Sequence, residues 1–219
     1  MSEIKLKKNV HSRNQEFADQ NRQQFQSAGI FTVNILGSPG AGKTSLVEQT
    51  VQQLSPLPRI LVIEGDVETE YDADRIRKLG VEAIRIQTNG ACHLDAIMIR
   101  EYIGEKNLSD FQLLFIENVG NLICPAGFDL GEDTRVVVGS TTEGDDKPIK
   151  YPEMYYTANA CVINKIDLIP HINFNLEDFK TRARQANEDL LFLPLSCTSG
   201  EGMAQWLDWL KQGMASRQG

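Results

Sequence analysis

Short apolar runs alternate with stretches of helical periodicity along most of the chain. The apolar runs predict buried strands at 31–36, 59–64, 83–87, 112–117, 134–139, 158–163 and 191–195. The segments between them predict helices at 12–28, 44–54, 71–79, 93–105, 175–188 and 200–215. Strands that alternate with helices indicate an α/β fold in which helices flank a doubly wound, mostly parallel sheet.

The pattern changes near residue 30, where a polar N-terminal segment gives way to the first strand. We expect residues 1–29 to form a helical extension packed on the domain, and residues 30–219 to form one compact domain. A chain of 219 residues is long enough to bury a full core. Residues 119–133 and 140–157 are long irregular connections, and such loops in a compact domain tend to be functional.

The segment from Gly37 to Thr44 reads GSPGAGKT and lies between an apolar run and a helical segment. This is the setting of a P-loop, in which glycines let backbone N–H groups turn toward phosphate oxygens. Lys43 then reaches the β- and γ-phosphates, and the Thr44 hydroxyl faces Mg²⁺. The sequence therefore predicts a nucleoside triphosphate site in a P-loop domain, with these binding residues: Gly37, Gly40, Ala41, Gly42, Lys43, Thr44 and Ser45.

A second motif, NKID, follows the predicted strand 158–163 and indicates which base is bound. The Asp167 carboxylate can accept hydrogen bonds from the N1–H and the exocyclic amine of guanine, whereas adenine would leave it unpaired. Lys165 can lie along the purine, and Asn164 can tie this loop to the P-loop. Ser196 and Cys197 follow the last strand, where backbone contacts to the base are expected. Taken alone, NKID could equally be a polar turn.

Several acids end strands that should lie beside the P-loop. Asp66 ends the second strand and Glu117 ends the fourth, and the carboxyl edge of an open α/β sheet is where ligands bind. We expect Mg²⁺ to be held by Thr44, Asp66, Glu117 and, as a weaker candidate, Asp72, which could instead be a helix N-terminal acid. Lys43, Asp66 and Glu117 are the candidate catalytic residues, since phosphoryl transfer depends on positioning and charge neutralisation.

A thiol and imidazole pattern distinguishes the chain from a generic nucleotide hydrolase. Cys92 and His93 follow the third strand, and Cys124 follows the fourth, so both loops leave the same edge of a parallel sheet. Two thiolates and one imidazole suit Zn²⁺ or Ni²⁺. Water, Asp95 or a second subunit could complete the coordination. The competing interpretation is that these are small buried side chains, which is the interpretation that we give Cys161 inside its apolar strand.

Composition narrows the class of protein. The net charge of −8 argues against a nucleic acid or an anionic membrane as partner. No apolar stretch has the length of a membrane span, and the charged N-terminus lacks the apolar core of a signal peptide, so the cytoplasm is the expected compartment. Four scattered cysteines do not suggest a disulfide scaffold.

Six motifs together resemble the HypB family, the nickel-incorporation GTPases of nickel–iron hydrogenase maturation: GSPGAGKT, EGDVETEYDADR, TNGACHLDA, FIENVGNLICP, GDDKPIKYP and NKID. The resemblance covers about residues 30–215. It implies a GTPase of the SIMIBI class that dimerises when GTP is bound. It further implies nickel or zinc at Cys92, His93 and Cys124 near the subunit interface, a HypA-type metallochaperone as partner, and delivery of nickel to the hydrogenase large-subunit precursor. Separately, the sequence has no evident arginine finger, which predicts slow intrinsic turnover.

Other interpretations stay open at this point. A urease-type nickel GTPase shares the P-loop and the NKxD motif but commonly has a Cys-Pro-His order, whereas Cys92 and His93 are adjacent here. A GTP-regulated interaction protein with structural zinc and, more weakly, a nucleotide kinase are further alternatives. The sequence does not determine whether the metal is nickel or zinc, which hydrogenase is served, or whether Lys147 and Lys150 contact nucleotide across a dimer or only balance nearby acids.

Overall fold

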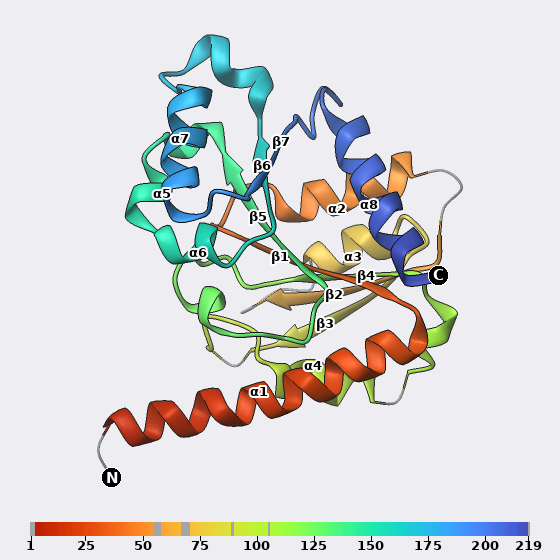
Figure 1. Ribbon diagram of the computed structural model, residues 1–219. Coiled ribbons are helices and arrows are strands. Elements are labelled where there is room, and N and C mark those ends of the chain that lie inside the picture. Colours follow the sequence, from red (N-terminus) through yellow and green to blue (C-terminus); the bar gives the residue numbers. More distant parts are fainter. Residues whose placement is uncertain (1–2, 55–57, 67–70, 89, 105, 219) are drawn as a thin grey trace.

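The computed structural model describes residues 3–54, 58–66, 71–88, 90–104 and 106–218 and contains one seven-stranded sheet (Figure 1). The strands are β1 Phe31–Gly37, β2 Ile60–Asp66, β3 Glu82–Gln87, β4 Leu113–Glu117, β5 Thr134–Ser140, β6 Ala160–Asn164 and β7 Leu191–Pro194. The α-helices are α1 Glu3–Ala28, α2 Lys43–Gln53, α3 Tyr71–Arg77, α4 Ala96–Ile103, α5 Lys147–Lys150, α6 Pro152–Tyr156, α7 Leu176–Ala186 and α8 Met203–Gln218. Short 3-10 turns are η1 Leu108–Asp110, η2 Cys124–Gly127, η3 Thr141–Glu143 and η4 Ile166–His171.

The strands lie in the order β3-β2-β4-β1-β5-β6-β7, and all six ladders between neighbours are parallel. The predicted α/β fold with a doubly wound sheet is therefore confirmed. Strands β2, β3 and β4 lie on one side of β1 in the sheet, and strands β5, β6 and β7 lie on the other side. The order of the strands thus reverses beside β1, and in open α/β sheets ligands bind at the carboxyl edge near such a point.

Both faces of the sheet are buried, which explains why the strands read as continuous apolar runs. In β4, Leu113 and Phe115 belong to the core beneath α2, α3 and α8, whereas Leu114 and Ile116 belong to the core beneath α1 and α4. A third group of buried side chains lies beneath α6 and α7, on the same face as α1 and α4 but on the other side of β1. Figure 1 shows these helices arranged on the two faces of the twisted sheet.

One predicted helix, 93–105, is wrong at its start. The helix α4 begins at Ala96, because the Asp95 side chain caps it by accepting a hydrogen bond from the Met98 N–H at 2.8 Å. Cys92 and His93 consequently lie on a loop and not on a helix. The first helix also begins earlier than predicted, at Glu3. The two long connections contain short helical turns: η2 in the first, and η3, α5 and α6 in the second.

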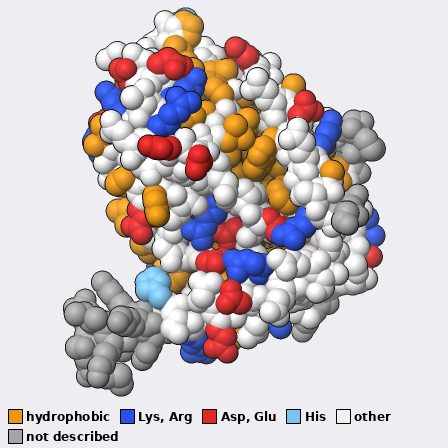
Figure 2. All heavy atoms as spheres, viewed as in Figure 1, with side chains coloured by type: hydrophobic (Ala, Val, Ile, Leu, Met, Phe, Trp, Pro, Cys, Tyr) orange, Lys and Arg blue, Asp and Glu red, His pale blue; other side chains and the backbone are white. Residues whose placement is uncertain are grey.

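The surface carries both signs of charge. On the face seen in Figure 2, acidic and basic side chains are interspersed. In the described part of the chain, no helix combines the length and the apolar character that crossing a membrane requires.

A buried hydrogen bond joins α2 to α8 and gives a test of the core. Trp206 Nε1 donates to Thr50 Oγ1 at 2.7 Å, and both side chains are fully buried. Replacing Thr50 by valine leaves the indole N–H without its acceptor, so the free energy of unfolding should fall by about 1–3 kcal/mol. Urea denaturation measures this change. The matched control is Thr157→Val, because the Thr157 hydroxyl bonds only to backbone carbonyls of its own helix. Equal losses in the two variants would contradict the prediction.

Candidate functional site

The P-loop joins the end of β1 to the start of α2. Gly42 has φ of 99°, and a Cβ atom there would lie 2.2 Å from Asn164 Nδ2, so only glycine fits this position. The buried Lys43 side chain curls back over the loop, with Nζ 3.4 Å from the carbonyl oxygen of Gly37 and 3.2 Å from that of Ser38. The loop therefore holds an ammonium group where the terminal phosphates of a nucleotide would lie.

The NKID loop is fastened to the P-loop by two hydrogen bonds. Asn164 Nδ2 donates to the carbonyl oxygen of Ala41 at 3.0 Å, and Lys165 Nζ donates to that of Gly40 at 2.8 Å. Asn164 Oδ1 also accepts from the backbone N–H of Cys197 at 3.2 Å. Lys165 adopts a left-handed φ of 64°. The loops after β1, β6 and β7 are thus held together, although they come from distant parts of the sequence.

Asp167 presents an unused acceptor to the same cavity. Its Oδ1 atom is buried and has no hydrogen-bond partner among the described residues. A buried acceptor without a partner is costly unless a ligand supplies the donor. The N1–H and amino group of guanine are donors of the required kind, and adenine lacks this pair.

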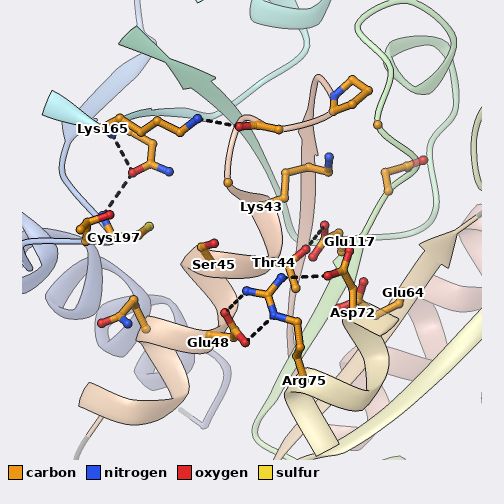
Figure 3. A pocket seen from close by; sticks show the side chains of 18 of the residues that line it. Lys43, Thr44, Ser45, Glu48, Glu64, Asp72, Arg75, Glu117, Lys165 and Cys197 are labelled. Atoms are coloured by element: carbon orange, nitrogen blue, oxygen red, sulfur yellow. Dashed lines mark hydrogen bonds and ion pairs between the residues drawn. The ribbon is translucent and has the colours of Figure 1, made fainter. Parts of the chain in front are cut away.

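A cavity of about 840 Å³ brings these loops together (Figure 3). Of the predicted nucleotide-binding, catalytic and magnesium-binding residues, those that line it are Gly40, Gly42, Lys43, Thr44, Ser45, Asp72, Glu117, Asn164, Lys165, Asp167 and Cys197. Gly37, Ala41 and Ser196 are not among the lining residues. The buried Ser196 hydroxyl instead accepts hydrogen bonds from the backbone N–H groups of Thr198 and Ser199, and so shapes the loop that carries Cys197. Lys147 and Lys150 do not line the cavity either, and Lys150 pairs with Asp146 at 2.5 Å on the surface.

Glu117 and Thr44 form the candidate magnesium site. Thr44 Oγ1 donates to Glu117 Oε1 at 2.9 Å, and the other carboxylate oxygen has no hydrogen-bond partner among the described residues. Complete burial raises the pKa of Glu117 to about 7, despite the nearby Lys43 ammonium. A buried carboxylate with a free oxygen beside a hydroxyl fits a hard divalent cation that takes oxygen ligands.

The other two predicted magnesium ligands are Asp66 and Asp72, and the structure gives less support to them than to Thr44 and Glu117. Asp66 is the last residue of β2, at the expected edge, but its side chain lies outside the described part of the structure. Asp72 lies in the first turn of α3 and lines the cavity, where it accepts a hydrogen bond from Arg75 at 2.9 Å (Figure 3). Asp72 therefore neutralises a cation of its own helix in this structure.

Arg75 is a residue of the cavity that the sequence interpretation missed. Its guanidinium lies between Asp72 and Glu48, and its Nε donates to Glu48 at 2.9 Å (Figure 3). These two carboxylates hold the side chain beside Thr44 and Glu117. The spacing of three residues between Asp72 and Arg75 was the only local signal for this pair.

The candidate soft-metal residues converge as predicted. Ligand atoms of Cys92, His93 and Cys124 all lie within 4.8 Å of one another, and Cys92 Sγ is 3.7 Å from His93 Nδ1. The Cys124 thiol, with some burial, raises the pKa of Cys92, while burial lowers the pKa of His93. A neutral imidazole is the form that binds a metal, and a bound cation would favour the two thiolates. Cys161 is buried inside β6, away from this cluster.

Arg135 of β5 forms hydrogen bonds with the loop that carries Cys124. Its guanidinium donates to the carbonyl oxygens of Ala126 and Phe128, both at 3.0 Å, and pairs with Glu132 at 2.5 Å. Because these bonds fix the backbone of η2, the position of Cys124 is determined by the sheet.

Asn121 connects the nucleotide cavity to the thiol and imidazole cluster. Its backbone N–H donates to the carbonyl oxygen of Gly37 in the P-loop at 3.1 Å, and its side chain donates to that of Cys92 at 3.3 Å. Its Oδ1 accepts from the N–H of Ile123, the residue before Cys124. A movement of the P-loop or of the segment after β4 would therefore reach both loops that carry the thiol and imidazole cluster.

Comparison with known proteins gives a consistent result. Residues 31–194 match the family model described as the CobW/HypB/UreG nucleotide-binding domain. The hydrogenase maturation factor HypB of Azotobacter vinelandii is 43% identical over 214 residues, which cover 98% of this chain and 71% of that protein.

Two solved structures are also similar. HypB from Archaeoglobus fulgidus has a TM-score of 0.87 and 39% identity, over 93% of this chain and 99% of that one. HypB from Helicobacter pylori in complex with nickel has a TM-score of 0.87 and 33% identity, over 93% and 96% of the two chains.

Proposed function

The chain belongs to the HypB family, and on this premise we propose that it is a GTP-hydrolysing metallochaperone that inserts nickel during hydrogenase maturation. The observation that carries the proposal is the convergence of Cys92, His93 and Cys124 on loops joined to the nucleotide cavity through Asn121. Membership of the HypB family favours hydrogenase maturation over the urease-type alternative.

The proposed substrate is GTP, and Asp167 supports the choice of base. Its buried, unused oxygen would accept the donors of guanine, while Lys165 stacks along the ring and Asn164 keeps the loop on the P-loop. Lys43 would neutralise the terminal phosphates. Mg²⁺, when bound by Thr44 and Glu117, would supply further charge neutralisation on the phosphate oxygens.

Nickel is the proposed cargo of the cluster. Two thiolates and one imidazole suit a borderline or soft ion, and three protein ligands leave the coordination incomplete. A second copy of the chain would complete it, so we propose that GTP promotes a homodimer with the metal at the interface. A HypA-type metallochaperone and the hydrogenase large-subunit precursor are the proposed partners for loading and delivery.

Coupling between the two sites would run through Asn121 and Gly120. Gly120 packs closely on Pro39 of the P-loop, where a Cβ atom would lie 3.0 Å from the proline ring. When the γ-phosphate orders the segment after β4, this segment would shift the backbone that carries Cys92 and Cys124. The affinity for nickel would then differ between the GTP and GDP forms.

The proposal is tested by titrating the purified protein with Ni²⁺ and with Zn²⁺, in GDP and in a non-hydrolysable GTP analogue, while light scattering follows the mass. We expect the nickel affinity to differ between the two nucleotides and the dimer to form only with the analogue. Cys92→Ala should lower the affinity at least tenfold, by about 1.4 kcal/mol or more. The matched control is Cys161→Ala, which removes a thiol outside the cluster.

Two outcomes would overturn the proposal. Nickel binding that survives in Cys92→Ala would place the cargo elsewhere. Zinc that is held tightly and equally in both nucleotide forms, with no dimer, would instead favour a GTP-regulated interaction protein with a structural metal.

A further inference from the structure

The N-terminal helix α1 contacts the segments that directly follow both loops of the cluster. It runs along α4 on one face of the sheet (Figure 1). Asn14, on α1 and 5% exposed, bonds with one amide group to the two segments that directly follow the loops of the cluster. Its Oδ1 accepts from the N–H of Ala96 at 2.9 Å, and its Nδ2 donates to the carbonyl oxygen of Asp129 at 2.8 Å. Ala96 lies three residues after His93, and Asp129 follows η2 closely.

Asn21 repeats this bridge two turns further along the helix. Its Nδ2 donates to the carbonyl oxygens of Ala96 at 2.9 Å and of Leu130 at 3.1 Å, and the side chain is fully buried. Arg22 adds an ion pair to the Asp129 carboxylate, at 2.7 Å. Since buried amide hydrogen bonds are costly to leave unmade, these contacts fix the two segments at a set distance.

Ring contacts also connect α1 to His93, one of the three cluster residues. The Phe128 ring, just beyond η2, stacks on the His93 imidazole with centroids 3.8 Å apart and planes at 27°. On α1, His11 lies against the same Phe128 ring, with centroids 5.1 Å apart. His93 is thus held by a residue of the opposite loop, which is in turn covered by α1.

We propose that α1 is a clamp that sets the separation of the Cys92–His93 loop from the Cys124 loop, and thereby the nickel affinity of the cluster. The inference rests on the proposed function. Asn14, Asn21 and Phe128 act as positioning residues, because they touch the segments that carry the ligands and not the metal. Groups around the ligands commonly change metal affinity by about 10–100-fold when they are removed.

The test compares variants of the full chain in nickel competition titrations against a chromophoric chelator, together with the thiolate-to-nickel charge-transfer band. We expect Asn14→Ala and Phe128→Leu each to weaken nickel binding by about tenfold or more and to shift the band. GDP affinity should change by less than about twofold, which shows that the variants fold. Phe128→Tyr keeps the ring over His93 and should restore wild-type affinity.

The matched control is Gln24→Ala. Gln24 joins α1 to α4 through Arg100 at 3.0 Å, but it contacts neither metal-binding loop, so its removal should leave nickel affinity unchanged. Nickel affinity that stays unchanged in folded Asn14→Ala and Phe128→Leu, while Cys124→Ala abolishes it, would overturn the clamp and leave the proposed function intact. Nickel binding that persists in Cys124→Ala would overturn the proposed function as well.

Discussion

Replacing Asp167 by asparagine is expected to lower the affinity for GTP by about four orders of magnitude and to create affinity for xanthosine triphosphate. In the proposed site the Asp167 carboxylate would accept hydrogen bonds from two donors of guanine, the N1–H and the 2-amino group. An asparagine amide offers one acceptor and one donor, so it would face the guanine amino group with an N–H. Xanthine carries a carbonyl at that position and matches the amide.

The measurement is a competition of GTP, XTP and ATP for each protein, followed by hydrolysis of each triphosphate at saturation. The nucleotide preference should reverse from GTP to XTP, while hydrolysis of bound XTP stays close to the wild-type rate because the phosphate contacts are untouched. Asp208→Asn, at an exposed position on α8, is the control for the loss of one charge. An undiminished GTP affinity in Asp167→Asn would show that the base lies elsewhere.

Replacing Lys43 by alanine is expected to slow GTP hydrolysis by about a thousandfold. The Lys43 ammonium is held by two P-loop carbonyl oxygens, close to where the γ-phosphate would lie, and the side chain is only 7% exposed. GDP makes fewer contacts with this group, so its affinity should fall much less than the rate. A hydrolysis rate that falls much more than the GDP affinity indicates the loss of a catalytic group, whereas a damaged fold would lower both.

Phosphate release from a single turnover, with the enzyme in excess, measures the rate at the chemical step. GDP affinity is measured in parallel by fluorescence of a labelled nucleotide. Lys211→Ala removes a lysine from the exposed side of α8 and should leave both quantities unchanged. A rate within tenfold of wild type in Lys43→Ala would mean that another cation neutralises the γ-phosphate, and Arg75 would be the first to examine.

The sheet and the main site could be predicted because their signals are local. The first four residues of β4, Leu-Leu-Phe-Ile, are apolar on both faces, and the segment GSPGAGKT joins an apolar run to a helical one. The convergence of Cys92 and Cys124 followed from a general rule, since parallel strands place the ends of their connecting loops at one edge. These inferences needed no knowledge of individual contacts.

The missed features depend on contacts between distant residues. Asn14 is one polar residue among many in a polar segment, and its bonds to Asp129 and Ala96 join positions that no local pattern relates. Asn121 likewise gives no sign in the sequence that it reaches Cys92. The predicted start of α4 is wrong because the Asp95 side chain caps the helix through the Met98 N–H, so that the first helical residue is Ala96 and not His93.

The hydrogen bond between Asn164 and Ala41 spans 123 positions of the sequence, and this has a consequence for synthesis of the protein. The P-loop leaves the ribosome early, but the NKID loop follows only after six of the seven strands of the described sheet have been made. A nascent chain therefore passes through most of its synthesis without the complete nucleotide pocket. Because a ligand stabilises only the state that binds it, a nucleotide can assist the last stage of folding but not the earlier ones.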